Sequence, residues 1–187
     1  MKQNINDNVT LFRYEKSHDD LFEGCWPIRD GVSINAYCVL GTEKKVLIDY
    51  TESGASFDSD LADMGLRLED IDILVLNHME PDHTGALNVL FRRCPDIQVY
   101  ATRLGATETE TLYGHKNVHI IANGEELDIG GKTLVFYTTP NIHWPDTMMT
   151  FIKEDGILFS CDAFGAFGSY QSVFDDELTE QEWALLR

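Results

Sequence analysis

One short segment of the sequence, NHMEPDHTGAL (residues 77–87), concentrates side chains that bind metal ions. Two histidines and two carboxylates lie within six positions: His78, Glu80, Asp82 and His83. Neutral imidazoles and carboxylates are common ligands of transition metals, so a turn that carries four of them can present several donors to one point. The chain has only 6 histidines, and two of them lie here.

Two further candidate ligands lie downstream, each at the predicted end of a strand. His143 occurs in PNIHWPDTM and Asp162 occurs in LFSCDAFG. Six donors are too many for one tetrahedral ion and suit two ions, and an aspartate such as Asp162 can bridge a metal pair through its two oxygens. An ordinary polar position on the surface, or a helix-capping role around Asp82, would explain any one of these residues. Six residues in this order favour a dinuclear metal site.

The rest of the chain alternates short β-rich runs with turns and a few helical segments. Hairpins are predicted over 33–41 with 44–51 and over 148–153 with 157–162. Further strands are predicted at 72–78, 97–102, 117–122 and 132–140, and helices at 105–114 and from Pro81 through 85–94. This order predicts an α/β sandwich of two mixed sheets with helices outside. The candidate ligands fall where strands end, the usual place for a site on such a scaffold.

Composition limits the class of protein. The chain has 187 residues, of which 43% are hydrophobic and 25% charged, which is typical of one globular domain. No apolar run has membrane-spanning length and the N-terminus does not resemble a signal peptide, so a cytoplasmic protein is predicted. The net charge of -18 argues against nucleic acid and membrane surfaces as partners. The 4 cysteines form no C-x-x-C pair, which excludes a rubredoxin-type site or a zinc ribbon within the chain.

Three segments in order, NHMEPDHTGAL, IHWPDTM and CDAFGAFG, resemble the diiron domain of flavodiiron proteins, a branch of the metallo-β-lactamase-like fold. The segment LFEGCWPIRDGVSINAYCVLG (21–41) resembles the N-terminal part of the same domain. The resemblance covers nearly the whole chain. It implies that residues 1–187 form a metallo-β-lactamase-like αββα sandwich.

The same resemblance implies two iron ions and a role for each candidate ligand. One iron would be held by His78, Glu80 and His143. The second would be held by Asp82 and His83, and Asp162 would bridge the two; these ligands would be the only catalytic residues.

The chain departs from the family pattern in two ways. The second iron of the family takes one more histidine from an H-G-P-type segment, and no histidine follows Asp162 here. The flavodoxin domain that carries FMN is not present in this chain, and neither is a rubredoxin domain. We therefore expect the domain to lack its C-terminal part, and FMN or another electron donor to come from missing sequence or from a partner. The family commonly forms head-to-tail dimers, so a homodimer is expected.

Glu80 distinguishes redox from hydrolytic chemistry. Dinuclear zinc hydrolases of the same superfamily use H-x-H-x-D-H, with a histidine where this chain has Glu80. A carboxylate makes the site more anionic and richer in oxygen, which stabilises the higher oxidation state of iron, while zinc needs no redox flexibility. The substitution favours iron without forbidding zinc.

Three functions follow from these observations. The first is reduction of dioxygen to water, of nitric oxide to nitrous oxide, or of both, with electrons from an external redox protein. The second is a flavin-free sensor that binds dioxygen at the same diiron centre and acts on a signalling partner. The third, favoured least, is a dinuclear zinc hydrolase.

Several residues near the motifs remain open or are set aside. Asp49 could support a ligand or serve a structural turn. Cys161 could be a redox thiol, but a small buried strand residue is favoured. Trp144 and Phe164 could shield the site or pack in the core. The remaining histidines, His18, His115 and His119, are predicted to be solvated or structural.

Overall fold

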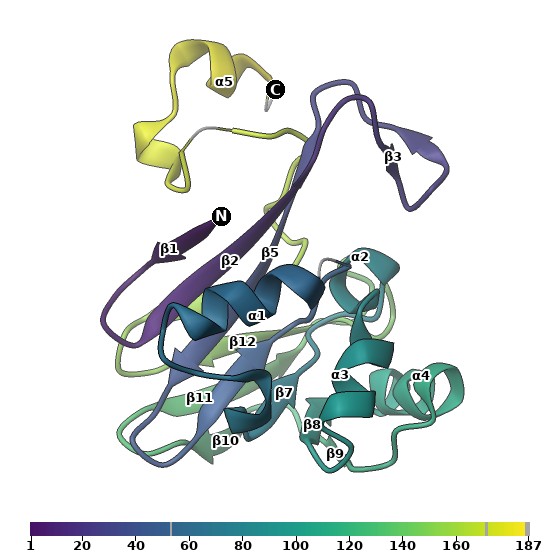
Figure 1. The fold of residues 1–187 in the computed structure, drawn as a ribbon, viewed down its shortest axis with the longest axis vertical. Coiled ribbons are helices and arrows are strands. Elements are labelled where there is room, and N and C mark those ends of the chain that lie inside the picture. The colour runs from purple at the N-terminus through teal and green to yellow at the C-terminus, as the bar shows by residue number, and fades with distance from the viewer. Residues whose placement is uncertain (53, 171, 186–187) are drawn as a thin grey trace.

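The computed structural model describes residues 1–52, 54–170 and 172–185, whose strands form two facing sheets and a small hairpin (Figure 1). The larger sheet has the strand order β1 (Lys2–Asn4), β2 (Val9–Lys16), β5 (Val32–Leu40), β6 (Lys45–Ile48), β7 (Ile73–Val75), β8 (Gln98–Ala101) and β9 (Val118–Ile120). The smaller sheet has the order β10 (Glu125–Asp128), β11 (Thr133–Thr138), β12 (Met148–Ile152) and β13 (Ile157–Phe159). The hairpin pairs β3 (Leu21–Phe22) with β4 (Trp26–Pro27).

The helices among these residues are mostly short. They are α1 (Gly54–Ala62), α2 (Pro81–Thr84), α3 (Leu87–Arg93), α4 (Arg103–Tyr113) and α5 (Glu180–Leu185), with 3-10 turns at Leu68–Asp70 and Asp175–Glu177. Figure 1 shows α1, α3 and α4 beside the larger sheet and α5 apart from them, near the upper ends of β2 and β5. No described helix has both the length and the apolar character needed to cross a membrane.

The central strands of the larger sheet, β6, β7 and β8, are buried on both faces, and successive residues along each strand pack on opposite faces. On one face Leu47, Leu74 and Val99 join the core that packs against α1 and α3. On the other face Ile48 and Ile73 join the core shared with the smaller sheet. Strands buried on both sides read as continuous apolar runs, which explains why residues 72–78 lack alternation in the sequence.

The predicted α/β sandwich and both predicted hairpins are confirmed. β5 pairs with β6 and β12 pairs with β13, each antiparallel. The larger sheet is mixed, because β6 to β9 run parallel while β1, β2, β5 and β6 are antiparallel. The smaller sheet differs from the prediction, since all of its described pairs are antiparallel.

The single helix predicted to start at Pro81 is wrong, because two helices, α2 and α3, are separated at Gly85 and Ala86. A Cβ atom at Gly85 would lie 2.7 Å from the carbonyl oxygen of Pro81 and 2.7 Å from Cγ of Glu52. This close approach requires glycine and lets the chain turn. β2 was not predicted, because Arg13 and Lys16 are buried within it and disguise the strand.

Arg13 connects β2 to the segment that follows β13. Its guanidinium donates to the carbonyl oxygens of Tyr170 and of Ser172, the latter at 3.0 Å, and to Oγ of Ser33 at 2.7 Å. A parallel bridge between Val32 and Gly168 lies beside these bonds. The chain after β13 is therefore held along β5, and it runs past the end of the sheet where the candidate ligands lie.

The core between the sheets gives the first testable prediction. Leu134 is fully buried on β11, and replacing it by alanine removes packing between the two sheets. We expect Leu134→Ala to lower the free energy of unfolding by about 2–5 kcal/mol, measured by urea denaturation. The control Leu112→Ala, at a leucine of α4 that is 64% exposed, is expected to change it by less than about 0.5 kcal/mol. Equal effects of the two substitutions would contradict the assignment of the core.

Candidate metal centre

The first part of the site is the loop after β7, which a buried polar network holds in place. The amide nitrogen of Asn77 donates to Oδ1 of Asp49 at 2.9 Å, and its side-chain nitrogen donates to the carbonyl oxygen of Phe159 at 3.3 Å. Oγ1 of Thr150 donates to Oδ1 of Asn77 at 2.7 Å. These bonds tie β7 to both sheets immediately before His78, so the backbone that carries His78 is fixed from several sides.

The second part of the site is α2, which begins without using the side chain of Glu80 as a cap. Glu80 occupies the N-cap position, but its side chain makes no capping hydrogen bond, and Pro81 supplies the first turn with a residue that needs no donor partner. Oγ1 of Thr84 donates to the carbonyl oxygen of Glu80 at 3.0 Å. Asp82 and His83 then fall within the first turn of the helix and are buried.

The remaining two candidates come from loops of the smaller sheet. His143 lies in the connection between β11 and β12, and Asp162 lies just after β13. The amide of Gly165 donates to the carbonyl oxygen of Asp162 at 2.9 Å, which closes a tight turn behind that carboxylate. Both loops bring their side chains to the N-terminal end of α2, where His143 contacts Glu80 and Asp162 contacts His83.

One group of side chains surrounds Glu80. Its Oε2 lies 2.9 Å from Nε2 of His78 and 3.0 Å from Nε2 of His143. Oδ2 of Asp162 lies 3.2 Å from Nε2 of His143 and 3.6 Å from Nε2 of His78. One donor atom from each of these four residues lies within 4.8 Å of the others.

A second group adjoins the first through the same aspartate. Nε2 of His83 lies 2.8 Å from Oδ1 of Asp162 and 3.4 Å from Oδ2 of Asp82. The two oxygens of Asp162 thus face different histidines. The structure brings together all six residues that the sequence singled out, and it divides them into the two groups expected for two ions.

Each of the two most buried histidines has a carboxylate behind it. Nδ1 of His78 lies 3.0 Å from Oδ2 of Asp146, which also accepts from the amide of Met79 at 2.8 Å. Nδ1 of His83 lies 3.2 Å from Oδ2 of Asp49. A carboxylate at Nδ1 keeps the proton there and leaves the Nε2 lone pair directed into the site.

This geometry favours the supporting role of Asp49 over that of a simple turn residue. Asp146 was not singled out from the sequence. It lies three positions after His143 in IHWPDTM, and that proximity was the only signal available. Thr102, the N-cap of α4, helps to position it by donating to its carbonyl oxygen at 2.8 Å.

His83 and Asp162 stabilise each other's charged forms. Burial opposes ionisation of Asp162, but a hydrogen bond and the charge of His83 outweigh it and lower the pKa of Asp162 to about 2. Burial also opposes protonation of His83, yet its hydrogen bonds to Asp162 and Asp49 raise its pKa well above the usual value. The pKa of Asp82 is raised to about 6, chiefly by burial.

The donor set fits a pair of metal ions. Three imidazoles and three carboxylates converge, which suits borderline transition metals better than it suits calcium or magnesium. Oδ1 of Asp82 is buried and has no hydrogen-bond partner among the described residues. A buried carboxylate oxygen without a partner is costly, and coordination to a cation would remove that cost.

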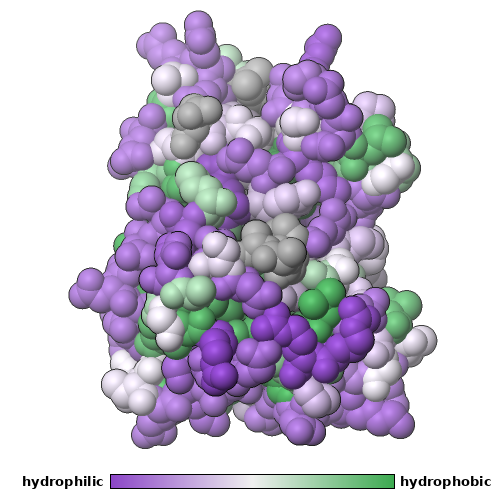
Figure 2. Space-filling view, viewed as in Figure 1, coloured by the Kyte–Doolittle hydropathy of each residue, from purple (hydrophilic) through white to green (hydrophobic). Residues whose placement is uncertain are grey.

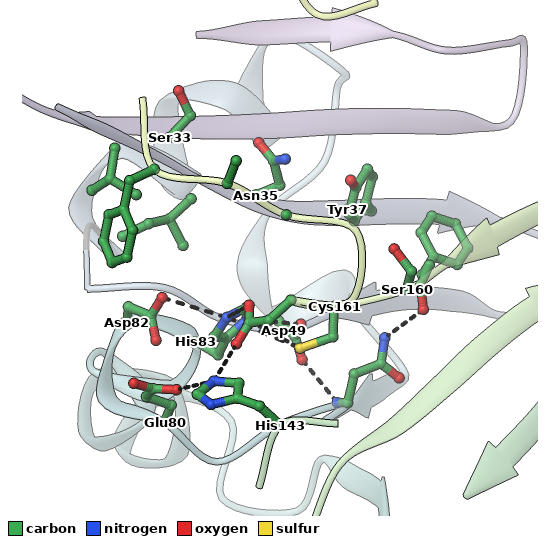
Figure 3. A pocket seen from close by; sticks show the side chains of 18 of the residues that line it. Ser33, Asn35, Tyr37, Asp49, Glu80, Asp82, His83, His143, Ser160 and Cys161 are labelled. Carbon is green, nitrogen blue, oxygen red and sulfur yellow. Dashed lines mark hydrogen bonds and ion pairs between the residues drawn. The ribbon is translucent and has the colours of Figure 1, made fainter. Parts of the chain in front are cut away.

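A cavity of about 330 Å³ opens beside these residues (Figure 3). One wall carries the metal-binding candidates, and the opposite wall carries the side chains of Ser33, Asn35 and Tyr37 from β5. Phe22 and Phe167 also line it, and their rings meet edge to face at 5.4 Å. The hairpin β3–β4 and the segment after β13 therefore meet beside the cavity.

The residues set aside in the sequence have different outcomes. The favoured strand position of Cys161 is wrong, because it follows the end of β13 and lines the cavity, with Sγ 3.9 Å from Nδ1 of His83. Trp144 packs edge to face on His78 at 5.1 Å. Core packing is wrong for Phe164, which is 91% exposed. His115 is structural, since it is buried and stacks on the ring of Phe91.

Comparison with known proteins gives one consistent family. The family described as "ODP family beta lactamase" matches residues 32–184. An anaerobic nitric oxide reductase flavorubredoxin from Klebsiella pneumoniae is 39% identical over 175 residues, which cover 84% of this chain and 35% of that protein. The chain thus spans little more than a third of the length of this curated relative.

Solved structures agree with this result. A variant of a flavo di-iron protein from Thermotoga maritima has a TM-score of 0.86 and 34% identity, over 98% of this chain and 47% of that one. The rubredoxin oxygen:oxidoreductase of Desulfovibrio gigas has a TM-score of 0.87 and 27% identity, over 100% of this chain and 47% of that one. The two sheets with their helices are accordingly the metallo-β-lactamase-like αββα fold that the sequence predicts. The chain belongs to the flavodiiron protein family, and the part of the family that it matches is the lactamase-like domain of the ODP family.

Proposed function

We propose that this chain holds two iron ions through His78, Glu80, Asp82, His83, His143 and Asp162, and that it reduces dioxygen, nitric oxide or both with electrons from an external donor. Two curated and structural relatives carry the names nitric oxide reductase and oxygen:oxidoreductase. We further propose a cytoplasmic homodimer served by a redox partner protein, with any FMN supplied from outside residues 1–187.

One observation carries the proposal. The carboxylate of Asp162 directs Oδ1 to His83 and Oδ2 to His143, so that one side chain connects two groups of donors. A single-ion site has no use for such a division, whereas a pair of ions requires a bridge. Glu80 in place of a third histidine makes the set more anionic and favours iron over zinc.

Bound as a pair, ferrous ions would supply electrons and open coordination positions for a diatomic gas. The protein side chains would hold and orient these ions. Asp146 and Asp49 would fix the tautomers of His78 and His83, and Trp144 would cover one face of the first imidazole. The aromatic rings of Phe22 and Phe167 give the cavity an apolar part in which a small uncharged gas can reside.

Iron loading and gas consumption test the proposal together. We expect the protein, loaded anaerobically with ferrous iron, to retain about two irons per chain, measured by metal analysis after desalting. With a chemical reductant and a flavin reductase as donor, it should consume dioxygen or nitric oxide at an electrode over many turnovers. His143→Asn should retain less iron and lose most of the consumption, because it removes a donor near Glu80.

The control for this experiment is His18→Asn, at an exposed histidine paired only with Asp19 among the described residues, which should behave as the unmodified protein does. An iron-loaded protein that leaves both gases untouched would refute the reductase proposal. A long-lived, oxygen-dependent absorption change without repeated turnover would instead indicate the sensor. Retention of zinc alone, with cleavage of an ester or thioester, would indicate the hydrolase.

The role of Asp146 gives a separate prediction. Asp146→Asn removes the negative charge behind His78 without removing a proposed ligand. We expect it to weaken iron binding by about 10- to 100-fold, measured by competition with a chelator, as for other carboxylates that support a metal-bound histidine. The matched control is Asp63→Asn, at an exposed aspartate that pairs with Lys2 on the surface and should leave the affinity unchanged. Equal affinities for the two variants would show that Asp146 does not orient His78.

A further inference from the structure

A fourth carboxylate approaches the candidate metal centre from outside the motifs described so far. Glu23 lies in the turn between β3 and β4, far from the other ligands in sequence. One carboxylate oxygen each from Glu23, Glu80 and Asp82 lie within 4.8 Å of one another. Glu80 belongs to one group of donors and Asp82 to the other, so Glu23 is close to both halves of the centre.

Two buried oxygens in this cluster are without partners. Oε1 of Glu23 and Oδ1 of Asp82 are both inaccessible to solvent and have no hydrogen-bond partner among the described residues. Asp82 itself is more than nine-tenths buried. The charges of Lys16 and His143 both act on Glu23, but Nζ of Lys16 pairs with Oε2 of Glu52 at 2.7 Å. Like charges at this separation repel, and a shared cation is the simplest group that would satisfy both oxygens.

The backbone holds Glu23 in an unusual conformation that aims it inward. Its φ is +51°, next to Gly24 at +73°, and the amide of Cys25 donates to the carbonyl oxygen of Phe22 at 3.1 Å. Two consecutive residues with positive φ make a tight hairpin turn in which glycine and asparagine are preferred over glutamate. A glutamate here is held at a backbone cost, and its side chain is the part that contacts the site.

We infer that Glu23 is an additional carboxylate ligand shared by the two metal ions. It would reach the pair from the side of Glu80 and Asp82, whereas Asp162 would reach it from between the histidines. The inference rests on the proposed dinuclear centre. It would give the second ion a further protein ligand beside Asp82, His83 and Asp162, the donors proposed for it above.

Anaerobic titration of the metal-free protein with ferrous iron alone tests this role. The readouts are the number of irons retained per chain and the Mössbauer spectrum, neither of which depends on activity. In Glu23→Gln we expect both irons to bind more weakly than in the unmodified protein, and the second at least tenfold more weakly. The Mössbauer components of both irons should change, because each loses the shared carboxylate.

Two companion variants separate ligation from folding. Glu23→Asn suits the positive φ of the turn, so it should fold at least as well and still lose the second iron. Glu43→Gln, at an exposed glutamate in the turn between β5 and β6, should bind both ions normally. Normal affinity for the second iron in either Glu23 variant would overturn the inference and leave the proposed function intact. If the unmodified protein itself binds fewer than two irons, the proposed function fails and the inference fails with it.

Discussion

The arrangement of the site depends on one shared carboxylate. Oδ1 of Asp162 lies 2.8 Å from Nε2 of His83, and its Oδ2 lies 3.2 Å from Nε2 of His143. A single side chain therefore connects α2 with the loop between β11 and β12 of the smaller sheet. Both sheets must therefore be in their correct register before the donors meet. A shift of β13 by one residue against β12 would turn the residues that follow it to the opposite face.

The rigidity needed for such convergence comes from strands that are buried on both faces. β7 lies between two parallel neighbours, with Leu74 packed toward the helices and Ile73 and Val75 packed toward the smaller sheet. Asn77 then continues the strand into a polar network that includes Asp49. The histidine that follows is held by packing and by hydrogen bonds at once, which limits its movement relative to the other ligands.

The sequence was most informative where residue type and order were both specific. Six candidate ligands could be singled out because the string HMEPDH places four of them within six positions, and the other two follow at strand ends. Asp146 and Glu23 could not be singled out, because each is one of 32 acidic residues and only the fold shows which of them face the site. β2 was missed for a related reason. The carbonyl oxygens that accept hydrogen bonds from its buried Arg13 belong to residues 170 and 172, which are far away in the sequence.

The concentration of acid at this site couples metal binding to folding. Glu23, Glu80 and Asp82 are close enough to repel one another, and hydrophobic burial must offset that repulsion in the metal-free protein. A metal ion bound there, as proposed, would remove repulsion as well as form bonds, and would thereby stabilise the folded state. The rest of the surface does not share this constraint. On the face shown in Figure 2 hydrophilic side chains predominate, and charges exposed to solvent in this way cost little. The buried carboxylates at the edge of the sheets lie close together, and they are the ones whose charge a bound cation would balance.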